Sequence, residues 1–290
     1  MKKLLSIVLM LTIFQVSYSQ KSVEYYVTHN ESKIFVKEIG KGPTLILLHG
    51  GPADNHLSFM PYAEELSKNF RVIMYDQNDA GKSTSATQKP HTAAREIETL
   101  EFLRTHLKLE KLSLVGHSWG TILSLMYAEK YPQHIHKISL ISSVGTSFQY
   151  YIQFAQNLQK KFTQEDIKKM QALSSKPNVK PSELLDIYLP YYFFDNANIK
   201  KLTKTDINFS VNREILTDIS QKFNLRGKEP IFKFPILVLQ GVSDLLTPED
   251  IKKAFLNFPD VEITAISKAG HFPYVENPNE VTQKLTTFFN

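Results

Sequence analysis

The chain has 290 residues, of which 42% are hydrophobic and 22% charged, a composition typical of a soluble globular protein rather than a disordered or fibrous one. It contains no cysteine, which excludes disulfides, thiolate nucleophiles and thiolate metal sites. Its net charge of +5 falls to +3 without Lys2 and Lys3, which is too balanced to indicate nucleic-acid binding. Any chemistry must therefore use oxygen and nitrogen side chains.

The first nineteen residues have the pattern of a secretory signal peptide. Two lysines provide a positive start, residues 4–16 are mostly apolar, and Ser17 and Ser19 are small residues spaced for cleavage. The apolar run is shorter than the roughly 20 residues that span a bilayer. The alternative is a buried N-terminal helix. We expect residues 1–19 to be removed after Ser19, leaving a periplasmic or secreted protein with no stable membrane insertion.

Short β-rich apolar runs alternate with helical patterns, which predicts an α/β fold with a mostly parallel central sheet flanked by helices. Two antiparallel opening strands are expected, followed by strands in the βαβ pattern. The expected strands are residues 23–27, 34–38, 44–48, 71–75, 112–115, 137–141, 236–240 and 261–266. The expected helices are residues 55–68, 91–107, 119–130, 248–257 and 278–289.

The alternation stops between Ser143 and Pro230, where the sequence contains no convincing strand and many aromatic residues. We interpret this stretch as a helical cap at residues 146–230. The cap would interrupt a core built from residues 20–145 and 231–290.

A Gly-x-Ser-x-Gly motif occupies residues 116–120, where an expected strand ends and an expected helix begins. This context is the one in which the motif presents a serine nucleophile on a sharp turn. Such a turn strains the serine backbone, and side chains two residues to either side would collide with the neighbouring strand or helix. The motif therefore predicts Ser118 as a catalytic nucleophile.

A serine nucleophile needs a base to take its proton and a carboxylate to orient that base. Asp244 and His271 each follow an expected strand, where open parallel sheets place their sites. The chain order Ser118, Asp244, His271 is the order that this type of fold uses. We therefore predict these three residues as a catalytic triad.

Acyl transfer also needs two backbone N–H groups directed at the developing oxyanion. One is expected from Trp119, the residue after the nucleophile. The other is expected from Gly51 in the sequence His49-Gly50-Gly51-Pro52, because its N–H is free and its missing side chain allows substrate to approach.

These motifs together make the chain similar to the α/β-hydrolase superfamily over nearly its whole mature length, and most similar to proline iminopeptidases. The resemblance rests on His49-Gly50-Gly51-Pro52, on Tyr75-Asp76-Gln77 leading to Gly81-Lys82-Ser83, on residues 96–120, and on the segments around Asp244 and His271. It implies a helical cap over the site, no cofactor and no metal. It also implies cleavage of an N-terminal residue, often proline, from a peptide or amide.

Two positions depart from the proline iminopeptidase pattern. Ala53 replaces the last glycine of HGGPG, and Asn78 stands where DQRG has its arginine. The family holds the substrate amine with carboxylates of the cap, and none of the available acids can be matched to that role by position. These acids are Glu183, Asp186, Asp195, Asp206, Glu214 and Asp218.

The predicted activity is therefore that of a secreted serine hydrolase, with an aminopeptidase as first choice. The alternative is an esterase, amidase or carbon–carbon hydrolase acting on a small molecule, because the fold does not fix the substrate. A hydrolase-like protein that only binds a ligand is the remaining alternative. The sequence does not indicate an oligomeric state.

Overall fold

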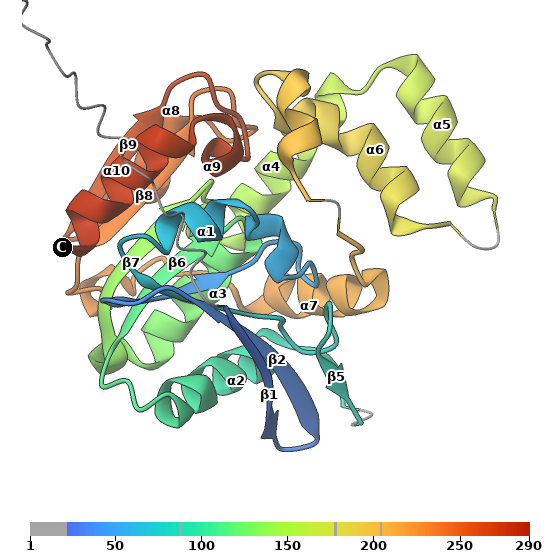
Figure 1. The fold of residues 1–290 in the computed structure, drawn as a ribbon. Helices are drawn as coiled ribbons and strands as arrows, with labels where there is room; N and C mark the ends of the chain where they lie inside the picture. Colours follow the sequence, from blue (N-terminus) through green and yellow to red (C-terminus); the bar gives the residue numbers. More distant parts are fainter. Residues whose placement is uncertain (1–21, 87–88, 177–178, 204) are drawn as a thin grey trace, which may run out of the picture.

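The computed structural model describes residues 22–86, 89–176, 179–203 and 205–290. The predicted signal peptide, residues 1–19, lies outside the described residues. The described residues form a mostly parallel sheet with helices on both faces (Figure 1), which confirms the predicted fold class.

Nine strands of the described residues form one sheet, in the order β1-β2-β4-β3-β6-β7-β8-β9, with β5 paired to β2. The first two strands are antiparallel to each other, and β2 is antiparallel to β4, whereas all pairs from β4 to β9 are parallel. The strands are β1 (Val23–His29), β2 (Ser32–Ile39), β3 (Thr44–Leu48), β4 (Arg71–Tyr75), β5 (Thr84–Ser85), β6 (Leu112–His117), β7 (Ile135–Ile141), β8 (Ile236–Gly241) and β9 (Val261–Ile266).

Helices connect the parallel strands. The α-helices are α1 (Tyr62–Leu66), α2 (Ala93–His106), α3 (Trp119–Lys130), α4 (Phe148–Lys161), α5 (Gln164–Ser174), α6 (Pro181–Tyr192), α7 (Phe209–Lys222), α8 (Pro248–Ala254), α9 (Pro273–Glu276) and α10 (Pro278–Phe289). Short 3₁₀ helices are η1 (His56–Phe59), η2 (Pro132–His134), η3 (Asn196–Lys201) and η4 (Glu229–Ile231).

Several predicted elements have the observed bounds, whereas others differ from the prediction or were not predicted. The strands at 44–48, 71–75 and 261–266 and the helices at 119–130 and 278–289 match. The helix predicted at 55–68 is instead η1 followed by α1, because Pro61 caps α1 and has no N–H to continue a helix. The two-residue strand β5 and the one-turn helix α9 were not predicted; both are too short to show a period.

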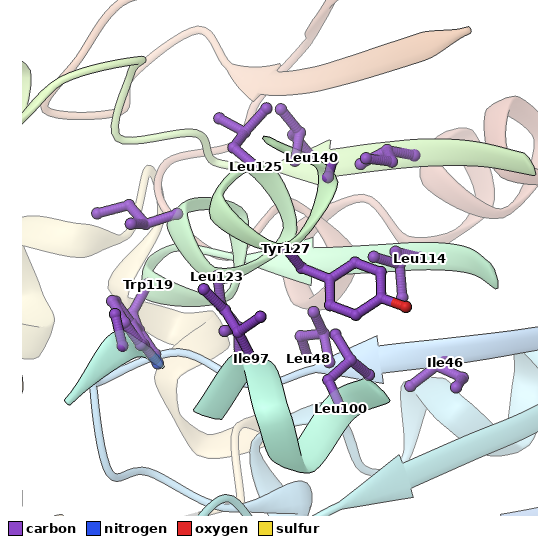
Figure 2. Close-up of a cluster of buried hydrophobic side chains, with 14 of the residues drawn as sticks. Ile46, Leu48, Ile97, Leu100, Leu114, Trp119, Leu123, Leu125, Tyr127 and Leu140 are labelled. Atoms are coloured by element: carbon purple, nitrogen blue, oxygen red, sulfur yellow. The ribbon is translucent and has the colours of Figure 1, made fainter. Parts of the chain in front are cut away.

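Successive side chains of β3 point to opposite faces of the sheet and enter two separate cores. Ile46 and Leu48 pack in one core with residues of α2 and α3, whereas Leu45 and Leu47 pack in the other with residues of α1 and α10. Figure 2 shows the first core, where Leu114 of β6 and Leu123 of α3 join the cluster. Burial on both faces fixes the sheet register and hence the positions of the strand ends.

The residues between β7 and β8 correspond to the stretch predicted as a cap, 146–230, which we call the cap segment. Its described residues form α4, α5, α6, α7, η3 and η4, with no strand among them. An isolated bridge between Ser147 and Asn224 joins the two ends of the segment. In Figure 1, α5 and α6 extend away from the sheet, whereas α7 lies close to α2.

The loop after β4 is held by a buried carboxyl group of α2. Glu96 is fully buried, and its Oε2 accepts hydrogen bonds from the Asn78 backbone N–H at 3.3 Å and side-chain amide at 3.0 Å. Its Oε1 has no hydrogen-bond partner among the described residues. Burial raises the pKa of Glu96 to about 7, and the bonds from Asn78 oppose this rise only in part. The amide of Asn78 supplies no charge where the related motif has arginine.

We expect folding stability to fall as the pH rises from about 4.5 to above 7, because the folded state binds the Glu96 proton more tightly than the unfolded chain. At about 1.4 kcal/mol per pKa unit, the loss reaches up to about 3 kcal/mol. The substitution Glu96→Gln should remove this dependence, so that the variant gains stability relative to the wild type at pH 8 but not at pH 5. Urea unfolding at both pH values measures it.

Glu98→Gln is the matched control, since Glu98 is an exposed carboxylate of the same helix. An equal pH dependence in the wild type, Glu96→Gln and Glu98→Gln would contradict the prediction.

Candidate active site

Ser118 lies at the sharp junction between β6 and α3. Its φ of 52° and ψ of −116° are a backbone conformation that side-chain-bearing residues rarely adopt. The parallel register of β3, β6 and β7 brings this junction to the carboxyl edge of the sheet. The serine is thus held at the strand ends, where sheets of this type place their sites.

The two glycines of the motif allow α3 to approach the sheet closely. A Cβ on Gly116 would lie 2.3 Å from the carbonyl oxygen of Gly120, and a Cβ on Gly120 would lie 2.1 Å from that of Leu48. Both distances are far below van der Waals contact. These are the collisions that the sequence motif predicts, and they explain why both positions are glycine.

The side chains of His271 and Asp244 form a buried pair beside this turn. His271 Nδ1 lies 2.9 Å from Asp244 Oδ1 and 3.0 Å from Oδ2. Since a carboxylate only accepts, Nδ1 carries the proton and Nε2 is the free position of the neutral ring. The two residues follow β9 and β8, which are neighbours in the sheet.

Further hydrogen bonds fix the Asp244 carboxylate. Its Oδ1 accepts the Leu245 backbone N–H at 2.6 Å, and its Oδ2 accepts the Gln240 side-chain amide at 2.9 Å. Gln240 also donates to the Leu246 carbonyl and accepts from the Ser143 N–H, so it is fixed in turn. This network orients the His271 ring through Asp244.

Ser118 and His271 both line a cavity of about 240 Å³ between the sheet edge and the cap segment. Ser118 makes no hydrogen bond to the imidazole among the described residues, and such bonds are often long in unliganded sites. Phe154 of α4 and Tyr192 of α6 pack against the His271 ring at centroid distances of 4.9 and 5.3 Å. The cap segment therefore covers the imidazole and narrows its access to water.

The loop after β3 forms the opposite wall of the cavity. Gly50 and Gly51 both line it, and a Cβ on Gly50 would lie 3.3 Å from Ser118 Cβ. Gly51 has a φ of 108°, which glycine adopts without strain. Trp119 is not among the lining residues; its side chain is buried in the core shown in Figure 2.

Gln77, which the sequence analysis did not assign to the site, connects these two regions. Its side chain accepts the Trp119 indole N–H at 2.7 Å and donates to the His49 carbonyl at 3.2 Å. Its backbone N–H donates to His49 Nε2 at 3.1 Å. A single buried amide thus links the residue after Ser118 to the glycine loop. The motif that begins at Tyr75 contains Gln77, but its role was not assigned from sequence because the residues that its side chain bonds, His49 and Trp119, are distant in the chain.

Two buried histidines near the serine are neutral. Burial lowers the pKa of His117 to about 3, and the neighbouring His271 adds to this effect. His117 Nε2 donates to the His271 carbonyl at 2.8 Å. Burial also lowers the pKa of His49, whose Nδ1 donates to the Gly50 carbonyl at 3.0 Å. Neither ring brings positive charge to the cavity.

Asp54 is a further lining residue that the sequence analysis did not single out. It follows Gly51 by three residues and belongs to the core rather than to the cap segment. Burial raises its pKa, an effect opposed by nearby His49 and by hydrogen bonds from Thr205, the Asn55 N–H and Ser58. Its Oδ1 is buried and has no hydrogen-bond partner among the described residues.

Of the six acids of the cap segment considered from sequence, Asp186 alone lines the cavity. Glu183 and Asp195 accept backbone N–H groups at the starts of α6 and η3. Glu214 and Asp218 accept the N–H groups of His91 and Ala93 near the start of α2. Asp206 is exposed. Four of these five carboxylates therefore bind backbone N–H groups, and the fifth is exposed at the surface.

Among residues 22–86, 89–176, 179–203 and 205–290, no helix combines the length and the apolar composition that spanning a bilayer requires. Within the same residues, no group of three or more acidic or histidine side chains is placed to hold a metal ion.

Comparison with known proteins agrees with this architecture. Residues 43–278 match the family model of the alpha/beta hydrolase fold. The chain is 37% identical over 116 residues to a proline iminopeptidase of Lactobacillus helveticus, a match that covers 39% of this chain and 40% of that protein. It is 26% identical over 287 residues to a proline iminopeptidase of Lacticaseibacillus rhamnosus, covering 91% and 97%.

Among solved structures, the proline iminopeptidase of Mycobacterium smegmatis superposes with a TM-score of 0.71 at 19% identity, covering 92% of this chain and 97% of that one. At 19% identity, the superposition shows only that the two proteins share a fold. Because the family model matches most of the chain, the protein belongs to the alpha/beta hydrolase family and is related to proline iminopeptidases.

Proposed function

We propose that the protein is a serine hydrolase that removes the N-terminal residue from a peptide or amide. One observation carries this proposal. The strained Ser118 and the imidazole of His271, which the buried Asp244 holds, line the same cavity, and the three residues follow three different strands. A turn with a serine of no catalytic role would not require a histidine that is oriented by a carboxylate and lines the same cavity as the serine.

In the proposed reaction, His271 Nε2 takes the Ser118 proton while Ser118 Oγ attacks the carbonyl carbon. Asp244 stabilises the imidazolium that forms. The backbone N–H groups of Gly51 and Trp119 bind the oxyanion. His271 then protonates the leaving amine as the carbon–nitrogen bond breaks, which leaves an acyl-enzyme. Water then attacks the carbonyl carbon of the acyl-enzyme while His271 Nε2 takes its proton. His271 returns that proton to Ser118 Oγ as the acyl group leaves, which restores the Ser118 hydroxyl.

The choice of an aminopeptidase is supported by the relationship to proline iminopeptidases and by the lining of the cavity. The lining is mostly aromatic and aliphatic, and its two charged side chains in the described residues, Asp54 and Asp186, are both acidic. Such a lining favours an apolar group that carries a positive charge, such as an N-terminal residue. Export, expected from residues 1–19, is a separate part of the proposal.

We expect Ser118→Ala to abolish covalent labelling by a fluorophosphonate and to lower kcat on amide substrates by a factor of roughly 10⁴ or more. The wild type should hydrolyse proline and alanine naphthylamides faster than their N-acetylated forms. Steady-state kinetics on these amides and on short nitrophenyl esters measures both expectations.

Full labelling of Ser118→Ala would refute the nucleophile. Turnover of esters alone would retain the nucleophile and make the protein an esterase. Inactivity of the wild type towards every substrate and the fluorophosphonate would favour a ligand-binding protein.

Gln77 is expected to act as a positioning residue, because it aligns the two regions that hold the proposed oxyanion donors. Gln77→Met keeps the side-chain volume but removes both side-chain hydrogen bonds. We expect kcat to fall roughly tenfold or more, since small displacements of oxyanion donors are costly, with KM little changed.

Gln153→Met is the matched control, because Gln153 of α4 bonds Asp250 outside the cavity lining. If Gln77→Met lowers the melting temperature but leaves kcat at the wild-type value, Gln77 is only structural.

A further inference from the structure

We infer that Asp54 binds the protonated N-terminal amine of the substrate, so that the amine is recognised from the core loop beside the nucleophile. This inference rests on the proposed function and specifies how its substrate is read. It also assigns amine binding to a residue of the core, whereas the resemblance to proline iminopeptidases implies carboxylates of the cap segment.

The position of Asp54 suits the geometry of the substrate. In an N-terminal residue, a single carbon separates the amine from the carbonyl that Ser118 would attack. The group that binds the amine must therefore lie beside the serine and the oxyanion donors. Asp54 lines the same cavity as Ser118 and Gly51, and its backbone nitrogen would lie 2.7 Å from a Cβ on Gly51.

The carboxylate of Asp54 also lacks a counter-charge. It forms no ion pair with a lysine, arginine or histidine among the described residues, and burial lowers the pKa of the nearby His49 ring, which is therefore neutral. Its Oδ1 is buried without a hydrogen bond, which costs free energy in the unliganded protein. A substrate ammonium group in the cavity would supply the missing charge.

The rest of the cavity supports a cation at this position. No lysine or arginine of the described residues lines it, and aromatic side chains of α4, α6 and α7 do, including Phe154, Tyr188 and Phe209. Aromatic ring faces attract cations. Asp186, the other acidic lining residue, belongs to α6, and it already has an interaction partner. Asp54 is the acid that comes from the loop of the oxyanion site.

The test is the substitution Asp54→Asn, which removes the charge at nearly constant volume. For each protein, kcat/KM is measured on proline naphthylamide and on its N-acetylated form. We expect the ratio of the two values to fall roughly 30-fold or more in Asp54→Asn, as expected when one partner of a buried charge pair is removed. Fluorophosphonate labelling reports whether the site of the variant is assembled.

Asp186→Asn is the matched control, because it removes the same charge from the same cavity. An equal fall of the ratio in both variants would mean that the preference depends only on the total negative charge of the cavity. That result would overturn the role of Asp54. A wild type that prefers the free amine, with the preference retained in Asp54→Asn, would overturn this inference and leave the aminopeptidase standing. A wild type without the preference would refute the aminopeptidase itself.

If Asp54→Asn does not fold, a second measurement tests the inference. It compares how well a charged and an uncharged small molecule protect the wild type and Asp186→Asn from fluorophosphonate labelling. Pyrrolidine, which is a cation at pH 7, and uncharged cyclopentanol have similar sizes. We expect pyrrolidine to protect at a concentration at least tenfold lower, in the wild type and equally in Asp186→Asn. Equal protection by the two compounds, or loss of the difference in Asp186→Asn, would overturn the inference.

Discussion

The close approach of α3 to β3 is the constraint on which the proposed site depends. At Gly120 the helix comes so near the sheet that a single added carbon would overlap the Leu48 carbonyl. This approach forces the chain to turn sharply after β6 and holds Ser118 in its rare backbone conformation. Strain of this kind, of order 1–3 kcal/mol, persists only where surrounding packing over-determines it. The two buried cores on either face of the sheet supply that packing.

Buried polar side chains then connect the strand ends to one another. Gln240 fixes the Asp244 carboxylate, which orients His271, while Gln77 links Trp119 to the glycine loop. Each of these groups is almost fully hydrogen-bonded, which makes the arrangement rigid. Glu96 differs from them, because its buried carboxyl has an amide partner rather than a cation and one of its oxygens has no hydrogen bond among the described residues. The proposed chemistry thus sits on a rigid edge, over which the cap segment contributes apolar surface and covers His271.

Charge is distributed differently in the cavity and over the whole molecule. The chain carries a net charge of +5, yet the lining contains two acids and, in the described residues, no lysine or arginine. Long-range attraction would therefore not account for the proposed recognition of a cation, which would come from local groups that line the cavity. This is why the position of one carboxylate, Asp54, carries more weight than the overall charge.

The sequence by itself determined the fold class, the approximate positions of eight strands and the identity of Ser118, Asp244 and His271 as candidates. It could do so because periodicity and the Gly-x-Ser-x-Gly turn are local signals, and because sites in such sheets follow strand ends. Only the tertiary structure decided which acids reach the cavity. Asp54 carries no local signature, and Gln77 belongs to a motif that does not show which residues its side chain bonds; both lie in surroundings that the folded chain brings together. The short elements β5 and α9 likewise depend on contacts rather than on a pattern.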